Sequence, residues 1–231
     1  MGELQKKMLM KMELRNLSKR TIGIYLFHMR RFVKYYGISP DKLGVSEVEE
    51  YLHTFYENKK SISSLVQAHG AIKFFYKEVL GKEEVVSKIL RPKIEKKIPV
   101  VLSKEEVKKI LESVNNYRVQ TVLMSIYSAG LRLSEALNLK ITDIDSQRMG
   151  IRIEQGKGKK DRYSILSKTL LERLREYYKI YHPKNYLFYG KTGKPLNGST
   201  IQRSFNLAKK KQRYQRKQQF IPYGIVLQPT F

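Results

Sequence analysis

The stretch from Tyr127 to Tyr163 constrains the fold most, because it specifies two helices, a hairpin and two turns in a fixed order. One helix is expected to end at Gly130, with Arg132 in the turn that follows. Ser134 is expected to cap the next helix, and Lys157 lies in a later turn between two glycines. Backbone without bulky neighbours can approach an anion closely, so the two cations are placed where a phosphate can meet them.

Two motifs in this stretch are similar to those of a known family. The first is Gly-Leu-Arg-Leu-Ser-Glu at residues 130–135, followed by a Thr-Asp-Ile-Asp turn at 142–145. The second is Gly-Lys-Gly-Lys-Lys-Asp-Arg at 156–162. In this order they resemble the first half of the active site of the tyrosine recombinases, the phage-integrase family, especially its Xer and integron-integrase branches. The likeness extends from about Leu17 to Lys211.

The resemblance implies a site-specific recombinase that breaks and rejoins DNA through a phosphotyrosine intermediate, without metal or cofactor, in a mobile element or phage. By this likeness Arg132 is the first of two arginines that clamp the scissile phosphate, with Glu135 supporting it. Lys157 would protonate the departing 5′ oxygen. Taken singly, Arg132 could be a surface residue, Lys157 a plain phosphate contact, and Glu135 an acid that stabilises its helix through the macrodipole.

The charge balance favours a polyanionic partner. The 231 residues include 46 Lys and Arg against 21 Asp and Glu, which gives a formal net charge of +25. A non-enzymatic basic DNA- or RNA-binding protein is therefore the alternative to a recombinase. RNA binding predicts a preference for single strands, whereas a recombinase predicts duplex binding with a steep salt dependence.

The sequence offers no sign of a metal site or a membrane span. It contains no Cys, and its four His do not cluster at ligand spacing, so we expect no metal. No apolar run approaches the roughly 20 residues that a membrane-spanning helix needs. We therefore expect a cytoplasmic protein with no membrane partner.

Two domains are predicted, and the fold class is mainly α with a small β-hairpin or sheet. Residues 1–92 would form a helical domain, which the resemblance identifies as a core-binding, SAM-like domain that holds one side of the DNA. Residues 93–102 have no apolar period and are expected to be a linker. Residues 103–211 would be the N-terminal half of an α+β catalytic domain.

Helical spacing in the first domain predicts three main helices after a ragged Lys/Met start. They run from a Ser18 cap to Gly37, from a capping box at Ser46, and from about Ser61 to Gly81. We expect the basic side chains of the first helix and of the later hairpin tip to contact DNA phosphates: Lys19, Arg20, Arg30, Arg31, Lys34, Lys159, Lys160 and Arg162.

Apolar residues alternate with polar ones on both sides of the glycine turn. Ile151 and Ile153 precede the turn, and Tyr163 and Ile165 follow it, so a β-hairpin with a basic tip is predicted. Residues 186–188 are expected to form another short strand.

The second half of the family's active site is missing from the residues after Lys211. A His-x-Leu-Arg-His box, a Gly-His pair and the nucleophilic Tyr are expected there, and no nucleophile can be nominated among the 16 Tyr. Gln218 to Phe231 can be written as every codon that could encode them and then read from the third base of each codon. The triplets then permit (Ala or Thr)-(Ile or Val)-His-Thr-Leu-Arg-His-Ser-Phe-Ala-Thr-His-Leu. We hypothesise that residues 212–231 are an out-of-frame, disordered tail that follows a truncated catalytic domain. Such a chain would be a catalytically incompetent DNA-binding remnant, able to associate with itself or with an intact recombinase on duplex DNA.

Overall fold

The computed structural model describes residues 2–94, 101–154, 161–190 and 192–211. The chain divides into two compact units, Met1–Lys97 and Ile98–Phe231. The division falls inside the range 93–102 that the sequence predicts as a linker. The two units are described separately.

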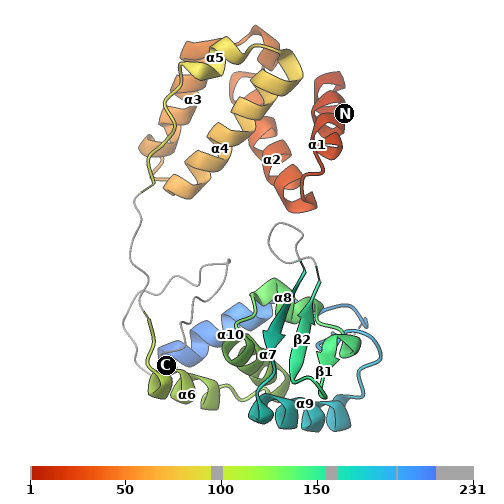
Figure 1. Ribbon diagram of the computed structural model, residues 1–231. Helices are drawn as coiled ribbons and strands as arrows, with labels where there is room; N and C mark the ends of the chain where they lie inside the picture. Colours follow the sequence, from red (N-terminus) through yellow and green to blue (C-terminus); the bar gives the residue numbers. More distant parts are fainter. Residues whose placement is uncertain (1, 95–100, 155–160, 191, 212–231) are drawn as a thin grey trace. The chain divides into compact units, whose positions relative to one another are not determined.

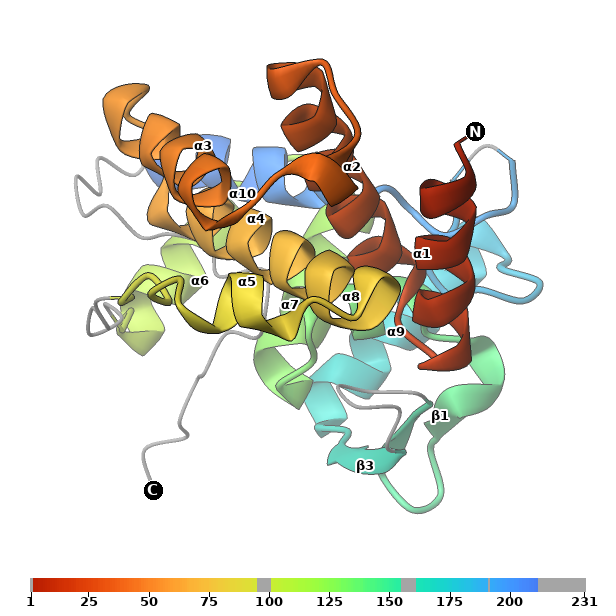
Figure 2. The ribbon, with the colours of Figure 1, turned by 90° about the horizontal axis from the view of Figure 1, so that it is seen from above.

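Unit 1 is entirely helical in its described part (Figures 1 and 2). Helix α4 packs against α2 and α3, and α1 packs against α2 and against the short π-helix that continues α4. The elements are α1 (Glu3–Leu14), α2 (Lys19–Tyr36), the 3-10 helix η1 (Pro40–Lys42), α3 (Val45–Glu57), α4 (Ile62–Phe74), the π-helix η2 (Phe75–Leu80) and α5 (Glu83–Ser87).

Helix α2 begins and ends where the sequence predicts. The Ser18 hydroxyl accepts a hydrogen bond from the backbone N–H of Thr21 at 3.1 Å, which satisfies one of the free donors of the first turn. Gly37 ends the helix with φ 69°, a left-handed conformation that glycine adopts without steric cost. The buried face of the helix contains Leu26, His28, Met29 and Phe32.

Two sequence-based expectations for unit 1 are wrong. The residues before Leu17 are not a ragged start but form α1, because Met8 and Met12 lie four residues apart on one face and are 1% and 0% exposed. Helix α3 begins at Val45 rather than after a Ser46 cap. The carboxylate of Glu47 accepts the backbone N–H of Gly44 at 2.7 Å, which fixes the start of the helix two residues earlier.

Unit 2 combines a small antiparallel sheet with helices (Figure 1). The strand order is β1-β2-β3, and α7 packs against α6, α8, α9, α10 and β3. The mainly helical fold class with a small sheet is therefore confirmed. The elements are α6 (Lys104–Glu112), α7 (Tyr117–Ala129), α8 (Leu133–Asn138), η3 (Ile141–Asp143), β1 (Ile144–Asp145), β2 (Gly150–Ile153), β3 (Arg162–Ile165), α9 (Lys168–Tyr181) and α10 (Gly198–Lys211).

The predicted hairpin is present, but only its first strand turns apolar residues inward. Ile151 and Ile153 are buried, and they pair with Ser164 and Arg162 respectively. Directly opposite residues share a face of the sheet, so the polar residues of β3 point toward the core and Tyr163 is 74% exposed. The strand expected at residues 186–188 is absent from the described part, where Lys140 and Tyr186 form a single bridge.

Candidate functional site

The turn between α7 and α8 positions Arg132 and Glu135. Helix α7 ends at Gly130, whose φ of 58° lets the chain reverse, and Arg132 becomes the N-cap residue of α8. Glu135 accepts the Arg132 backbone N–H at 2.9 Å and its guanidinium Nη1 at 2.5 Å. The expected Ser134 cap is thus wrong, because a carboxylate on the third residue of the helix satisfies the turn instead.

A second guanidinium binds the same carboxylate. Nη2 of Arg162, the first residue of β3, lies 2.8 Å from Glu135 Oε2 and 3.4 Å from the carbonyl oxygen of Gly130. The Glu135 side chain is 5% exposed, whereas those of Arg132 and Arg162 are 31% and 38% exposed. The buried acid therefore holds two arginines that both reach solvent, and we call these three residues the arginine pair site.

The arginine pair site carries a net positive charge. Burial alone would raise the pKa of Glu135, but the hydrogen bonds from Arg132 and the charges of Arg162 and Arg132 outweigh burial and hold that pKa below its ordinary value. The carboxylate is therefore ionised at neutral pH. Two guanidinium groups against one carboxylate leave one positive charge, which suits a phosphate oxygen.

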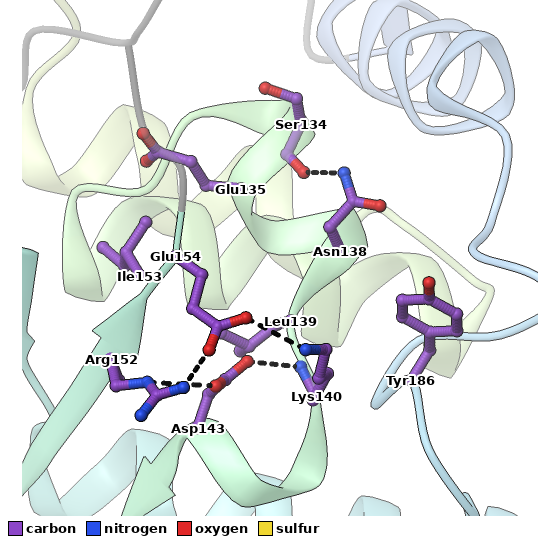
Figure 3. A pocket seen from close by; sticks show the side chains of 10 residues that line it. All are labelled: Ser134, Glu135, Asn138, Leu139, Lys140, Asp143, Arg152, Ile153, Glu154 and Tyr186. Atoms are coloured by element: carbon purple, nitrogen blue, oxygen red, sulfur yellow. Dashed lines mark hydrogen bonds and ion pairs between the residues drawn. The ribbon is translucent and has the colours of Figure 1, made fainter. Parts of the chain in front are cut away.

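Residues of α8, η3 and β2 line a cavity of about 440 Å³ (Figure 3). Its charged residues are already paired: Lys140 Nζ lies 2.9 Å from Glu154 Oε2, Arg152 also binds Glu154, and Arg152 Nε lies 3.9 Å from Asp143 Oδ1. Glu135 lines the cavity, but its carboxylate points away from this cluster in Figure 3. This ion-pair network holds the end of β2.

That network was not predicted from the sequence. Asp143, the second residue of the Thr-Asp-Ile-Asp turn, is 6% exposed and accepts the backbone N–H of Lys140 at 2.8 Å. An acid that caps the short η3 helix could be expected from such a turn. Its ion pair with Arg152 depends on strand register, which the turn does not specify.

Three predicted site residues, Lys157, Lys159 and Lys160, lie outside the described residues. Their assignments remain predictions from the motif, and so does the assignment of residues 212–231 as an out-of-frame tail. Arg162 is described, and its guanidinium binds Glu135.

The remaining predicted DNA contacts all lie on α2 and are exposed. Arg31 stacks over the ring of Phe27 at 5.6 Å. Arg31 and Lys34 also line a cavity of about 540 Å³ with Lys60 and Tyr51. The exposed cations of the helix are Lys19, Arg20, Arg30, Arg31 and Lys34.

The described residues contain neither a candidate metal site nor a candidate membrane span. No group of three or more His, Asp or Glu side chains there could hold a metal ion. In the same part of the chain, no helix is both long enough and apolar enough to cross a membrane.

The two units of this chain each match a family profile. The sequence profile described as "Phage integrase family" matches residues 100–223, and the profile "Phage integrase, N-terminal SAM-like domain" matches residues 4–84. The chain belongs to the phage integrase family of tyrosine recombinases.

Individual relatives agree with this assignment. Tyrosine recombinase XerA of Pyrococcus horikoshii is 36% identical over 168 residues, 73% of this chain and 57% of XerA. An integrase/recombinase of Escherichia coli is 37% identical over 163 residues, 69% of this chain and 48% of the relative. The chain spans between 48% and 66% of the length of four curated relatives that it matches.

Solved structures show the same fold at low sequence identity. A lambda integrase tetramer bound to a Holliday junction superposes with a TM-score of 0.69 at 16% identity and covers 90% of this chain and 64% of that one. XerH bound to difH substrate gives a TM-score of 0.68 at 23% identity, covering 88% and 67%.

Proposed function

We propose that this chain binds the duplex DNA of a recombination site through Arg132 of the arginine pair site and the basic face of α2. The observation that carries this proposal is the buried Glu135 carboxylate, which holds the Arg132 guanidinium at 2.5 Å while that group reaches solvent. A fixed guanidinium loses little conformational freedom when it binds, so it can grip a phosphate that a free surface arginine would hold weakly.

In the reaction of the family, each of the three motif residues would have a distinct task. Arg132 would bind the oxygens of the scissile phosphate, where charge develops when the phosphorus is attacked. Glu135 would orient Arg132. Lys157 would donate a proton to the departing 5′ oxygen, a role that rests on its place in the Gly-Lys-Gly motif.

We further propose that a protein made of these 231 residues holds DNA without cutting it. The sequence after α10 contains no His, and therefore no His-x-Leu-Arg-His box, and the second clamping Arg and the nucleophilic Tyr have no assignable counterpart. Groups that act as a unit give little rate enhancement when their partners are missing. Trapping on a nicked suicide substrate tests this: we expect no covalent protein–DNA adduct, and a phosphotyrosyl band would refute the proposal.

The hypothesis that residues 212–231 are out of frame would explain why the second half of the active site is missing. The family match extends to residue 223 and so includes the first part of the range 212–231. The codons of Gln218 to Phe231 nevertheless permit the missing box when read from each third base. Sequencing the gene decides the matter, because nucleotides that do not spell the box in that frame contradict the hypothesis.

Partners and location follow from the same proposal. Lambda integrase is described as a dimer on a core site and as a tetramer on a Holliday junction. We propose that this chain likewise associates on DNA, with itself or with an intact recombinase, in the cytoplasm. Analytical ultracentrifugation with and without a duplex site tests the association, and a complex that holds one chain per duplex contradicts it.

RNA binding is the second candidate, and the net charge of +25 favours it. The two functions differ in strand preference and in salt dependence. We expect gel-shift titrations at 50 and 200 mM salt to show tighter binding to duplex DNA than to single-stranded RNA, with an affinity that falls steeply with salt. Equal or tighter binding to single-stranded RNA would favour the alternative.

A further inference from the structure

We infer that Arg162 is a positioning residue, which acts on Arg132 through the shared Glu135 carboxylate rather than by contacting a DNA phosphate itself. The inference adds a role for Arg162 to the proposed function, and its consequence for DNA binding rests on that function. The basic motif at residues 156–162 suggests that this arginine contacts a phosphate directly. The inference replaces that role.

The geometry gives Glu135 two different partners on its two oxygens. Oε1 accepts Nη1 of Arg132 at 2.5 Å, and Oε2 accepts both the backbone N–H of Arg132 at 2.9 Å and Nη2 of Arg162 at 2.8 Å. The position of the carboxylate therefore depends on both arginines. If Arg162 is removed, one oxygen keeps only the backbone donor, and the carboxylate can rotate away from the Arg132 guanidinium.

Burial makes this second partner necessary. The Glu135 side chain is only 5% exposed, so its oxygens depend on protein donors rather than on bulk water. A buried charge without one of its partners pays a large desolvation penalty, which the protein can relieve by reorienting the group or by protonating it. Either response would release Arg132 from its present orientation.

Strand β3 is attached to the α7–α8 turn by more than this one side chain. The Ser164 hydroxyl donates to the carbonyl oxygen of Ala129 at 2.5 Å, and Arg162 Nη2 lies 3.4 Å from the carbonyl oxygen of Gly130. These bonds join consecutive residues at the end of α7 to alternate residues of β3. Arg162 is thus held over the turn from which Arg132 projects.

Register explains why Arg162 takes this place. It pairs with the buried Ile153 and so lies on the inward face of the hairpin, whereas its neighbour Tyr163 is 74% exposed on the opposite face. An arginine on the outward face could not reach the carboxylate. The inward register brings Arg162 to Glu135, although 27 residues separate the two in sequence.

The first test follows the Glu135 carboxyl group and the Arg132 side chain by NMR in the full chain. We expect Arg162→Gln to raise the pKa of Glu135 toward its ordinary value and to accelerate solvent exchange of the Arg132 guanidinium protons. Arg162→Lys keeps the charge but not the planar fork, so it should restore the titration in part. If Arg162→Gln fails to fold, the Glu135 titration and the Arg132 proton exchange are compared between Arg162→Lys and the unchanged protein.

The matched control is Arg148→Gln, since the Arg148 side chain is 89% exposed and its ion pair is with Asp145 of the neighbouring strand. This variant should leave the titration of Glu135 and the exchange of Arg132 unchanged. Unchanged titration and exchange in both Arg162 variants would overturn the inference.

The second test is a double-mutant cycle on duplex binding. If Arg162 acts through Glu135, Arg162→Gln should weaken duplex binding about threefold or more when Glu135 is present. The same substitution should have little effect in a Glu135→Gln background. A direct phosphate contact instead predicts that the salt slope, d log K/d log[salt], decreases in magnitude by about 0.9 in both backgrounds. That second result would overturn the inference. If the unchanged chain does not bind duplex DNA, the proposed function fails, while the NMR titration still decides whether Arg162 positions Arg132.

Discussion

Arg162, the first residue of β3, donates a hydrogen bond from its guanidinium to the buried carboxylate of Glu135 in α8 at 2.8 Å. This bond makes the hairpin and the α7–α8 turn into one structural unit. The orientation of Arg132, which binds the same carboxylate, therefore depends on a strand that follows it by some thirty residues of sequence. The phosphate-binding chemistry proposed for Arg132 depends in turn on this packing.

The ion pairs of Glu135 predict a pH-dependent contribution to stability. Its pKa is lower in the folded protein than its ordinary value of 4.5, so the ionised carboxylate stabilises unit 2 fully above that pH. This contribution disappears as the pH falls from 4.5 through the lower folded-state pKa. We expect Glu135→Gln to cost about 1–3 kcal/mol at pH 7, with the difference shrinking below pH 4.5. Urea denaturation at several pH values measures it, and a difference that is independent of pH contradicts the assignment.

The left-handed conformation of Gly130 predicts a graded response to substitution. Gly130 has a φ of 58° and no atom within 4 Å of an added Cβ, so strain comes from the backbone alone. Gly130→Ala should destabilise unit 2 by about 1–2 kcal/mol. Gly130→Asn is the matched variant and should cost less, because Asn tolerates this conformation. Thermal denaturation compares the two, and equal losses would show that the turn relaxes to another conformation.

Two buried tyrosines predict opposite results for removal of a hydroxyl group. The Tyr177 hydroxyl is buried without a hydrogen-bond partner among the described residues, so Tyr177→Phe should change the free energy of unfolding by less than about 0.5 kcal/mol or increase it. The Tyr76 hydroxyl donates to the carbonyl oxygens of Pro40 and Leu43, at 2.8 Å and 3.1 Å. Tyr76→Phe should cost about 1–1.5 kcal/mol. The unfolding transition of each unit gives the values, and a large loss for Tyr177→Phe would indicate a bond that the structure lacks.

The exposed cations of α2 are expected to affect duplex binding more than equally charged residues elsewhere on the chain. Replacing Arg30, Arg31 and Lys34 together by Gln should reduce the magnitude of the salt slope by about 0.9 for each DNA phosphate that these side chains neutralise. A control with the same change in charge neutralises three exposed cations of α9, Lys168, Arg175 and Lys179. The control should leave the slope nearly unchanged. Equal effects of the two triple variants would mean that only net charge matters.

Local signals explain how much of the fold could be predicted from the sequence. Ser18 and Gly37 marked the ends of α2, and Gly130 marked the end of α7. Each of these signals depends on residues within one or two turns of each other. The helix at residues 3–14 was missed because its lysines and its exposed Met10 and Leu14 mask the two buried methionines.

Long-range pairing explains what the sequence could not give. The motif around residue 132 predicted that Arg132 and Glu135 belong to one site, because they lie three positions apart on one short helix. The place of Arg162 depends on which face of β3 turns inward, and alternation predicted the wrong face. Tyr163 and Ile165 are the apolar residues of that strand, yet they are 74% and 77% exposed. The buried network of Asp143 and Arg152 was missed for the same reason.

The most direct test of the account measures duplex affinity against salt concentration for the unchanged chain, for Arg132→Ala and for the exposed-arginine control Arg148→Ala, with circular dichroism to confirm folding. We predict that Arg132→Ala weakens binding and lowers the magnitude of the salt slope by about 0.9, whereas Arg148→Ala leaves the slope unchanged. A slope for Arg132→Ala equal to that of the unchanged chain, or no binding of duplex DNA at all, would contradict the account.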